Sequence, residues 1–220
     1  MTYQVEIKFA EEERARRVIS RSNSRVTGKY PGLKSRRMHY WESSLERDAF
    51  MLLDVSTDVV TFDEQPVTLY YGIGKKLRHY PDVLVSYPNR QVFVEIKTDR
   101  EALSKEIVTR TAYLVPALAR HGYGYGYRIW TESEIRDRSF RLANLRFLLR
   151  FGRTEVELTR FEWLRQLFRK HASLPWKEIV GQPTDGGKLS ALCRLILEGR
   201  LRIDLTRPIL PESLVNVGRM

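Results

Sequence analysis

The chain has 220 residues, of which 42% are hydrophobic, enough for one large domain or a medium domain with a small second one. Its formal net charge of +11 favours a polyanionic partner such as nucleic acid, and its single cysteine, Cys193, excludes an internal disulfide and a multi-cysteine zinc cluster. No run approaches the roughly 18 to 20 apolar residues of a membrane span. The first 17 residues lack the apolar centre of a signal peptide, so we expect a cytoplasmic protein with no membrane partner.

Residues 1–40 are predicted to form a basic N-terminal arm with a short helix. Between Arg14 and Arg37 the sequence has nine basic residues and no acidic one, in a stretch rich in Ser and Gly. Two interpretations stay open. The arm is either a solvated, partly flexible segment or one that lies along phosphates and becomes ordered on contact.

Residues 41–149 read as a mixed α/β domain. Ser43 stands at a capping position before apolar residues at helical spacing, which predicts an amphipathic helix over 43–54. Turn residues then separate three β-like runs, which indicates an antiparallel meander or hairpin. A second helix, interrupted by Pro116, and a short strand follow. The expected runs are 59–71, 77–87 and 91–98, the helix is 102–120, and the last strand is 127–131.

Residues 150–220 are predicted to form a small C-terminal domain. Two or three short helices precede Gly199 and the basic and apolar alternation "GRLRIDLTRPI". This layout is compatible with a winged-helix module whose wing is that segment. A small helical domain with a terminal hairpin is the alternative. Cys193 lies among leucines and is predicted to be a core residue.

Two of the β-like runs, in "HYPDVLVSYPNRQVFVEIKTD" (79–99), deliver charged residues that a plain core strand does not need. A tight turn joins them, so pairing would bring Asp82 at the start of one strand close to the middle of the next. Strand alternation places Glu95 and Lys97 on one side of that strand and Ile96 on the other. Two carboxylates and an ammonium are therefore expected to converge.

Such a group of residues suits a metal-dependent phosphodiester hydrolase. Carboxylates of Asp82 and Glu95 with the backbone carbonyl of Ile96 make a hard oxygen site for Mg²⁺ or Mn²⁺. The ion would stabilise charge on a scissile phosphate, and Lys97 would orient or deprotonate the attacking water. This is the "PD…(D/E)xK" pattern of many nucleases, and Glu46, on the preceding helix, is a further candidate acid. Ordinary solvated Glu and Lys on a strand are the alternative reading.

The run "SSLERDAFMLLD…VVTFDEQPVTLYY…LRHYPDVLVSY…VFVEIKTD" resembles the N-terminal endonuclease domain of TnsA, a subunit of heteromeric transposases. The resemblance covers roughly residues 40 to 130, with four motifs in order, and extends less specifically to a small C-terminal domain. It implies a restriction-endonuclease-like α/β fold. It also implies metal-binding or catalytic roles for Glu46, Asp82, Glu95 and Lys97. Because some members have Gln at the position of Glu95, its carboxylate need not be indispensable.

The resemblance further implies an activity and partners. A TnsA-type subunit hydrolyses the phosphodiester bond at the 5′ ends of a transposon during cut-and-paste excision, while a TnsB-type DDE transposase cuts and joins the 3′ ends. The C-terminal domain would contact a TnsC-type ATPase. DNA would then be held through its backbone without base readout, and the protein alone would show little activity.

Three other functions compete with this hypothesis. One is a stand-alone nuclease of the same superfamily, of restriction or repair type. Another is a non-catalytic DNA-binding scaffold subunit that keeps the fold and has lost the chemistry. The third is a generic α/β domain with solvated charges. Gln65 also matches a motif of the family, with no role assigned, and Glu42 is interpreted as a helix-start acid.

Overall fold

A computed structural model gives the fold and describes residues 4–11, 15, 26–73, 75–137 and 139–218. The chain divides into two compact units, Met1–Asp137 and Arg138–Met220. The domain boundary expected after residue 149 falls inside a helix, α5 (Ser139–Gly152), of the second unit. The described residues contain eight helices and several sheets, so the protein is of the mixed α/β class. In the described part of the chain, no helix is long and apolar enough to cross a membrane.

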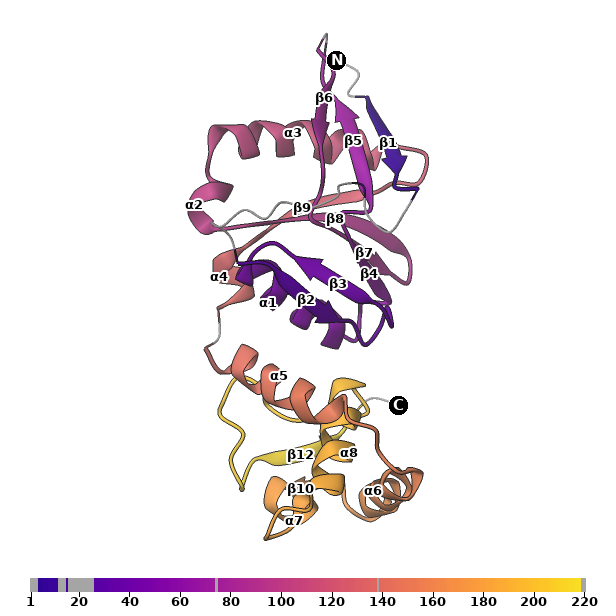
Figure 1. The fold of residues 1–220 in the computed structure, drawn as a ribbon, viewed down its shortest axis with the longest axis vertical. Helices are drawn as coiled ribbons and strands as arrows, with labels where there is room; N and C mark the ends of the chain where they lie inside the picture. The colour runs from indigo at the N-terminus through magenta and orange to yellow at the C-terminus, as the bar shows by residue number, and fades with distance from the viewer. Residues whose placement is uncertain (1–3, 12–14, 16–25, 74, 138, 219–220) are drawn as a thin grey trace. The chain divides into compact units, whose positions relative to one another are not determined.

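A four-stranded sheet in the order β4-β7-β8-β9 is the centre of the first unit (Figure 1). Its strands are β4 (Thr61–Glu64), β7 (Val83–Tyr87), β8 (Arg90–Lys97) and β9 (Gly126–Thr131). The predicted hairpin is confirmed, since β7 and β8 pair antiparallel around a turn at residues 88–89. The parallel pairing of β8 with β9 requires a crossover, which α2 (Asp99–Ala102) and α3 (Lys105–Ala119) supply. Helix α3 continues through Pro116.

The two faces of this sheet are covered by different helices, α1 (Ser44–Val55) on one and α3 on the other (Figure 1). Strand alternation explains the choice of face. Leu84 and Phe93 are paired across β7 and β8 and share a core with Leu114 of α3. On the opposite face Phe62 of β4 lies 5.6 Å, ring to ring, from Phe50 of α1. The helix predicted over 43–54 is confirmed.

A second sheet has the strand order β1-β5-β6. Each of two runs that are continuous in the sequence is divided between this sheet and the four-stranded sheet. Its strands are β1 (Val5–Phe9), β5 (Val67–Tyr71) and β6 (Leu77–His79). The run 59–71 breaks at Gln65-Pro66, and the run 77–87 breaks at Tyr80-Pro81. Proline supplies no N–H to the hydrogen-bond ladder of a sheet, so each run breaks at its proline, where the chain leaves one sheet and enters the other. The two breaks are adjacent, because the Gln65 N–H donates to the Asp82 carbonyl at 3.0 Å.

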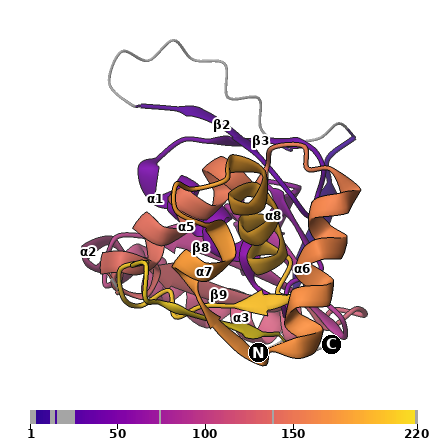
Figure 2. The ribbon, with the colours of Figure 1, turned by 90° about the horizontal axis from the view of Figure 1, so that it is seen from below.

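The described part of residues 1–40 forms strands and holds no helix. The alternation of "VEIKF" explains β1, which pairs with β5. β2 (Gly28–Pro31) and β3 (Met38–Trp41) form an antiparallel two-stranded ribbon near α1 (Figure 2). Of the predicted basic arm, residues 1–3, 12–14 and 16–25 lie outside the described residues.

The described residues of the second unit form four helices and a small antiparallel sheet in the order β10-β12-β11. Besides α5, its elements are α6 (Leu158–Lys170), β10 (Ser173–Pro175), α7 (Trp176–Val180), α8 (Gly186–Leu197), β11 (Leu201–Arg202) and β12 (Leu214–Val217). Helices lead into a hairpin between β11 and β12, as the sequence predicts. Cys193 is buried, and burial raises the pKa of its thiol to about 12.

Candidate active site

A cleft of about 690 Å³ opens where β7 begins, β8 ends and α1 starts. Four of the residues singled out from the sequence line it, and so do Glu42 and Gln65. The four are Glu46, Asp82, Ile96 and Lys97. Of the convergence expected from the strand pattern, Asp82 and Lys97 meet in this cleft, and Glu46 and the Ile96 carbonyl add further hard oxygen atoms beside the one cation.

Asp82 is fixed against β8 by the hairpin register. Val83 pairs with Val94, so Asp82, one residue earlier, reaches the end of the neighbouring strand. There its Oδ2 accepts a hydrogen bond from the Ile96 N–H at 2.7 Å. Because the strand holds the Ile96 N–H in place, the Asp82 carboxylate has a defined position with Oδ1 left for other partners.

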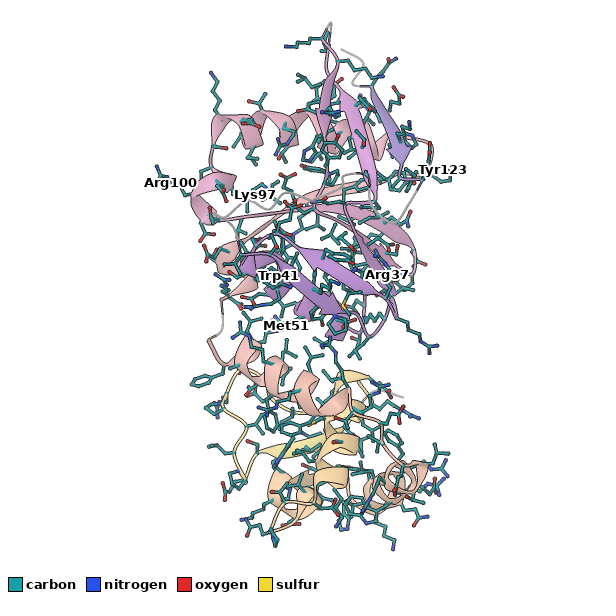
Figure 3. All side chains as sticks on the ribbon, in the orientation of Figure 1. Arg37, Trp41, Met51, Lys97, Arg100 and Tyr123 are labelled. Atoms are coloured by element: carbon teal, nitrogen blue, oxygen red, sulfur yellow. The ribbon has the colours of Figure 1, made fainter. Side chains whose placement is uncertain are left out.

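Lys97 sits among three oxygens at the end of β8 that leads into α2 (Figure 3). Its Nζ lies 3.2 Å from Asp82 Oδ2, 3.0 Å from the Ile96 carbonyl oxygen and 2.9 Å from Glu95 Oε1. These are the oxygens that the sequence analysis assigns to a metal ion. The Lys97 ammonium thus gives the oxygen cluster its own positive charge.

Glu46 comes from the first turn of α1, where the sequence "SSLE" makes a capping arrangement. The Ser43 hydroxyl accepts from the Glu46 N–H at 3.1 Å and donates to Glu46 Oε1 at 3.1 Å. The Glu42 N–H donates to Glu46 Oε2 at 2.8 Å. The helix start therefore holds the Glu46 carboxylate at the rim of the cleft, and the capping serine and the acid are parts of one local structure.

Glu95 occupies a different position from the other predicted site residues. It is 3% exposed, it does not line the cleft, and it faces α3 as its alternation with Phe93 requires. Its Oε2 lies 2.6 Å from His79 Nε2 and accepts from the Tyr127 hydroxyl at 3.0 Å. Its Oε1 accepts from Arg110 at 2.9 Å besides contacting Lys97. Both oxygens are engaged, and its link to the cleft is through Lys97.

The three acids differ in how far their neighbours offset the effect of burial on the pKa. It raises the pKa of Asp82, where the charge of Lys97 offsets only part of the effect and the charges of Glu95 and Glu46 add to it. Burial likewise raises the pKa of Glu46, assisted by the charge of Glu42. Burial alone would raise the pKa of Glu95 too, but His79, Lys97 and Arg110 outweigh it and lower that pKa. Glu95 is thus the stably ionised member of the group.

The donor set fits a hard divalent cation. Carboxylate oxygens of Asp82 and Glu46 and the carbonyl of Ile96 are ligands that Mg²⁺ and Mn²⁺ accept, with water in the remaining positions. Within the described ranges no three His, Cys, Asp or Glu side chains are grouped as a ready metal site. Glu95 is 3% exposed and does not line the cleft, so it fits the role of Lys97's partner better than that of a ligand.

Arg110 is a site neighbour that the sequence analysis does not identify. It reaches Glu95 from α3, 15 residues further along the chain, and no local pattern marks it. The sequence draws attention to Gln65 through the "EQP" motif and to Glu42 through its position one turn before Glu46. Neither feature predicts that the residue lines the cleft.

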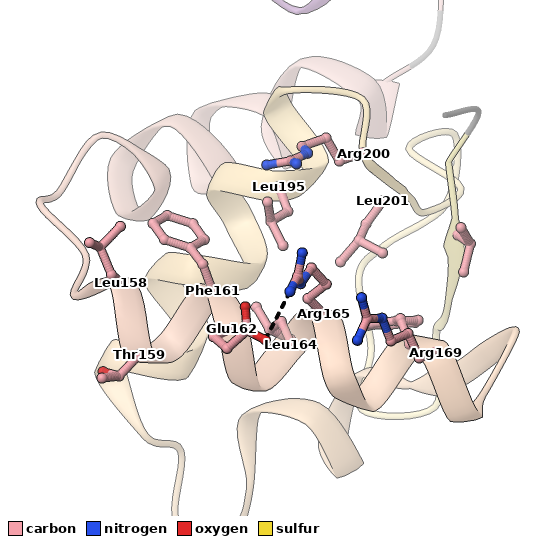
Figure 4. Close-up of a pocket in the computed structure, with 12 residues that line it drawn as sticks. Leu158, Thr159, Phe161, Glu162, Leu164, Arg165, Arg169, Leu195, Arg200 and Leu201 are labelled. Atoms are coloured by element: carbon pink, nitrogen blue, oxygen red, sulfur yellow. Dashed lines mark hydrogen bonds and ion pairs between the residues drawn. The ribbon is translucent and has the colours of Figure 1, made fainter.

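A second cavity, of about 1090 Å³, lies within the C-terminal unit between α6, α8 and the β11–β12 hairpin (Figure 4). Its apolar lining includes Leu164, Leu195 and Leu201. The guanidinium groups of Arg169 and Arg200 also line it, and neither group makes a hydrogen bond or ion pair with a described residue. The groove is therefore apolar inside and positively charged at its edge.

Comparison with known protein families finds no family model that matches this chain, and no characterised protein matches its sequence.

Proposed function

We propose that this protein is a Mg²⁺-dependent DNA endonuclease with a restriction-endonuclease-like fold, of the type represented by TnsA, the transposase subunit that cuts the 5′ ends of a transposon. The observation that carries the proposal is a cluster in one cleft: the Lys97 ammonium lies 3.2 Å from Asp82 Oδ2 and 3.0 Å from the Ile96 carbonyl oxygen, and the Ile96 N–H donates to Asp82 at 2.7 Å. A partly buried aspartate with a raised pKa beside a lysine in a cleft is typical of a functional site.

The residues of the cleft have different roles in the proposed hydrolysis. A bound Mg²⁺ or Mn²⁺ would supply stabilisation of the negative charge that develops on the scissile phosphate. Asp82, Glu46 and the Ile96 carbonyl would hold the ion. Lys97 would orient the attacking water and carry positive charge beside the phosphate. Glu95, kept ionised by its partners, would fix the position of Lys97.

The proposed partners are DNA at the transposon ends, a TnsB-type transposase and a TnsC-type ATPase. The net charge of +11 supports binding to the phosphate backbone without base recognition. We propose that the C-terminal unit binds the ATPase. Its apolar groove, with Arg169 and Arg200 at the edge, suits an acidic segment that carries leucine or phenylalanine.

Strand-specific nicking tests this function. A labelled transposon-end duplex is incubated with the protein, the transposase encoded with it and Mg²⁺, and the 5′-end and 3′-end cuts are measured separately. Asp82→Ala and Lys97→Ala should reduce 5′ cutting by at least about 10³-fold, the scale reached when a group that stabilises transition-state charge is removed. Cutting at the 3′ ends, which belongs to the transposase, should continue.

Matched controls remove charge outside the cleft. Lys105→Ala and Asp58→Asn change exposed residues and should cut at the wild-type rate. If the 5′ cut persists in both cleft variants, the proposed chemistry is wrong. Cutting of plain duplex DNA by the protein alone would instead favour a stand-alone nuclease, and a folded protein that neither binds Mn²⁺ nor cuts would favour a DNA-binding scaffold.

A further inference from the structure

Gln65 has an unusual backbone conformation at the edge of the cleft. It directly follows β4 and has a φ of 43°, in the left-handed region that non-glycine residues rarely adopt. Arg36 is the other non-glycine residue with a positive φ among the described residues. Backbone strain of this kind costs on the order of 1 kcal/mol and persists where the surrounding structure requires it. The position favours glycine, yet the chain has a glutamine there.

The side chain of Gln65 leaves one polar atom unsatisfied. The residue is 6% exposed, and its Oε1 has no hydrogen-bond partner in the described structure. Its Nε2 donates to Glu42 Oε1 at 2.9 Å. Rotating the amide by 180° would place Oε1 against that carboxylate oxygen, so Glu42 fixes which way the amide points. A buried acceptor without a donor costs about 1 to 3 kcal/mol, which calls for a donor that arrives from outside the protein.

The cleft itself indicates what that donor is. Gln65 lines the same cleft as Asp82 and Glu46, and its N–H donates to the Asp82 carbonyl at 3.0 Å. The backbone hydrogen bond between Gln65 and Asp82 therefore fixes the Gln65 side chain, with its acceptor Oε1, relative to the Asp82 carboxylate. A Mg²⁺ or Mn²⁺ ion keeps several waters when it binds one or two carboxylates, and these waters are hydrogen-bond donors.

We propose that Gln65 is a positioning residue for the hydrated metal ion: its Oε1 accepts a hydrogen bond from a water bound to the ion that Asp82 and Glu46 hold. This inference rests on the proposed function, because it needs the metal site. Partners that orient metal ligands through hydrogen bonds raise metal affinity by about 10- to 100-fold. The strained backbone and the unsatisfied acceptor of Gln65 then follow from a geometry that suits metal binding.

Calorimetric titration of the full-length protein with Mn²⁺ tests the proposal without relying on cleavage. Gln65→Met keeps the approximate size of the side chain and removes the acceptor, so it should weaken Mn²⁺ binding by about 10-fold or more. The double variant Glu42→Gln with Gln65→Glu exchanges the two partners and retains an acceptor at position 65. It should bind Mn²⁺ more tightly than Gln65→Met.

Thermal unfolding without metal separates positioning from a structural role. Gln65→Met removes a buried unsatisfied acceptor and should unfold at or above the wild-type temperature. A variant that unfolds earlier and binds Mn²⁺ as tightly as wild type would overturn the proposal.

Asp82→Asn separates this inference from the proposed function. If Asp82→Asn abolishes Mn²⁺ binding while Gln65→Met leaves it unchanged, the metal site stands and the role of Gln65 falls. If Asp82→Asn leaves Mn²⁺ binding unchanged, the proposed metal site falls, and with it the role of Gln65.

Discussion

Two charge clusters in the first unit differ in how completely their charges are balanced. The first, here called the ribbon cluster, joins the β2–β3 ribbon to β4 and consists of Ser35, Arg37, His39, Asp63 and Glu64. The second, the cleft cluster, consists of Glu42, Glu46, Gln65, Asp82 and Lys97. The ribbon cluster includes two almost completely buried ionisable residues, since His39 is 0% exposed and Glu64 1%.

The ribbon cluster is internally satisfied. Glu64 Oε2 lies 2.5 Å from His39 Nδ1 and 2.8 Å from Arg37 Nη2, and Ser35 Oγ lies 2.6 Å from His39 Nε2. Burial alone would raise the pKa of Glu64, but His39 and Arg37 outweigh it and lower that pKa. In the cleft cluster, by contrast, burial raises the pKa of Asp82 and of Glu46, and Gln65 Oε1 has no donor.

The difference separates structural charge from functional charge. A serine, a histidine and an acid in a row also suggest a nucleophile and its base, but the ribbon cluster has its histidine fully buried and its pairs complete, so it fastens two elements together. The cleft cluster holds excess negative charge and an open acceptor beside solvent. Residues arranged to bind a ligand commonly lower the free energy of unfolding of the protein below the value it would have without that function.

The largest expected effect is in the ribbon cluster. Glu64→Gln removes the charge that His39 and Arg37 face and should lower the free energy of unfolding by about 3 kcal/mol, since breaking a buried pair leaves its partners uncompensated. Urea denaturation at pH 7 measures it. Mn²⁺ affinity of the folded variant should match wild type. Asp63→Asn, at a half-exposed side chain, should change stability by under about 1 kcal/mol.

The loss in Glu64→Gln should depend on pH in a defined direction. Because folding lowers the pKa of Glu64, ionised Glu64 stabilises the fold at pH values above its unfolded pKa of about 4.3, and the contribution is lost as the pH falls through the folded value. The difference between wild type and Glu64→Gln should therefore be constant above about pH 6 and shrink below about pH 4. A difference that grows on acidification would contradict this account of the ribbon cluster.

Lys97→Met should give the next largest effect, on metal affinity. The Lys97 ammonium lies 3.2 Å from Asp82 Oδ2 and 3.0 Å from the Ile96 carbonyl oxygen, two of the oxygens proposed to hold the ion, so its positive charge opposes the binding of a cation there. The variant should bind Mn²⁺ at least about 10-fold more tightly, which corresponds to 1.4 kcal/mol, while 5′ cutting is lost. Lys105→Met is the matched control. Weaker Mn²⁺ binding by Lys97→Met would mean that the lysine does not share the position of the metal.

Local patterns in the sequence were sufficient to predict part of this structure. The β7–β8 hairpin followed from two apolar runs around "YPNR", and α1 followed from its serine cap and its spacing. These features depend on neighbouring residues. The division of two runs between two sheets depends instead on which edge of a sheet is free for pairing, and no periodicity contains that information. Pro66 and Pro81 indicate where the two runs break, but not which sheet each half joins.

The candidate site was predictable to a similar extent. Strand register sufficed to bring Asp82 to Ile96 and Lys97. Alternation also put Glu95 on the side of Lys97, but the interior position of its carboxylate depends on Arg110 and Tyr127, which arrive from α3 and β9. The roles of such residues follow from tertiary packing, which a pattern within one strand does not express.

The smallest expected effect, and the most direct test of the contrast between the clusters, is the stability of Asp82→Asn without metal. Asparagine keeps an oxygen that can accept from the Ile96 N–H and removes a buried charge that burial penalises. The free energy of unfolding at pH 8 should rise by about 1 kcal/mol, the size typical when a functional site is relieved of strain or charge.

Mn²⁺ should raise the melting temperature of wild type and leave that of Asp82→Asn unchanged, because only a ligand of the folded state stabilises it. Asp58→Asn should behave like wild type in both measurements. A clear loss of stability in metal-free Asp82→Asn would show that the Asp82 charge stabilises the fold as Glu64 does, and the two clusters would then be of one kind.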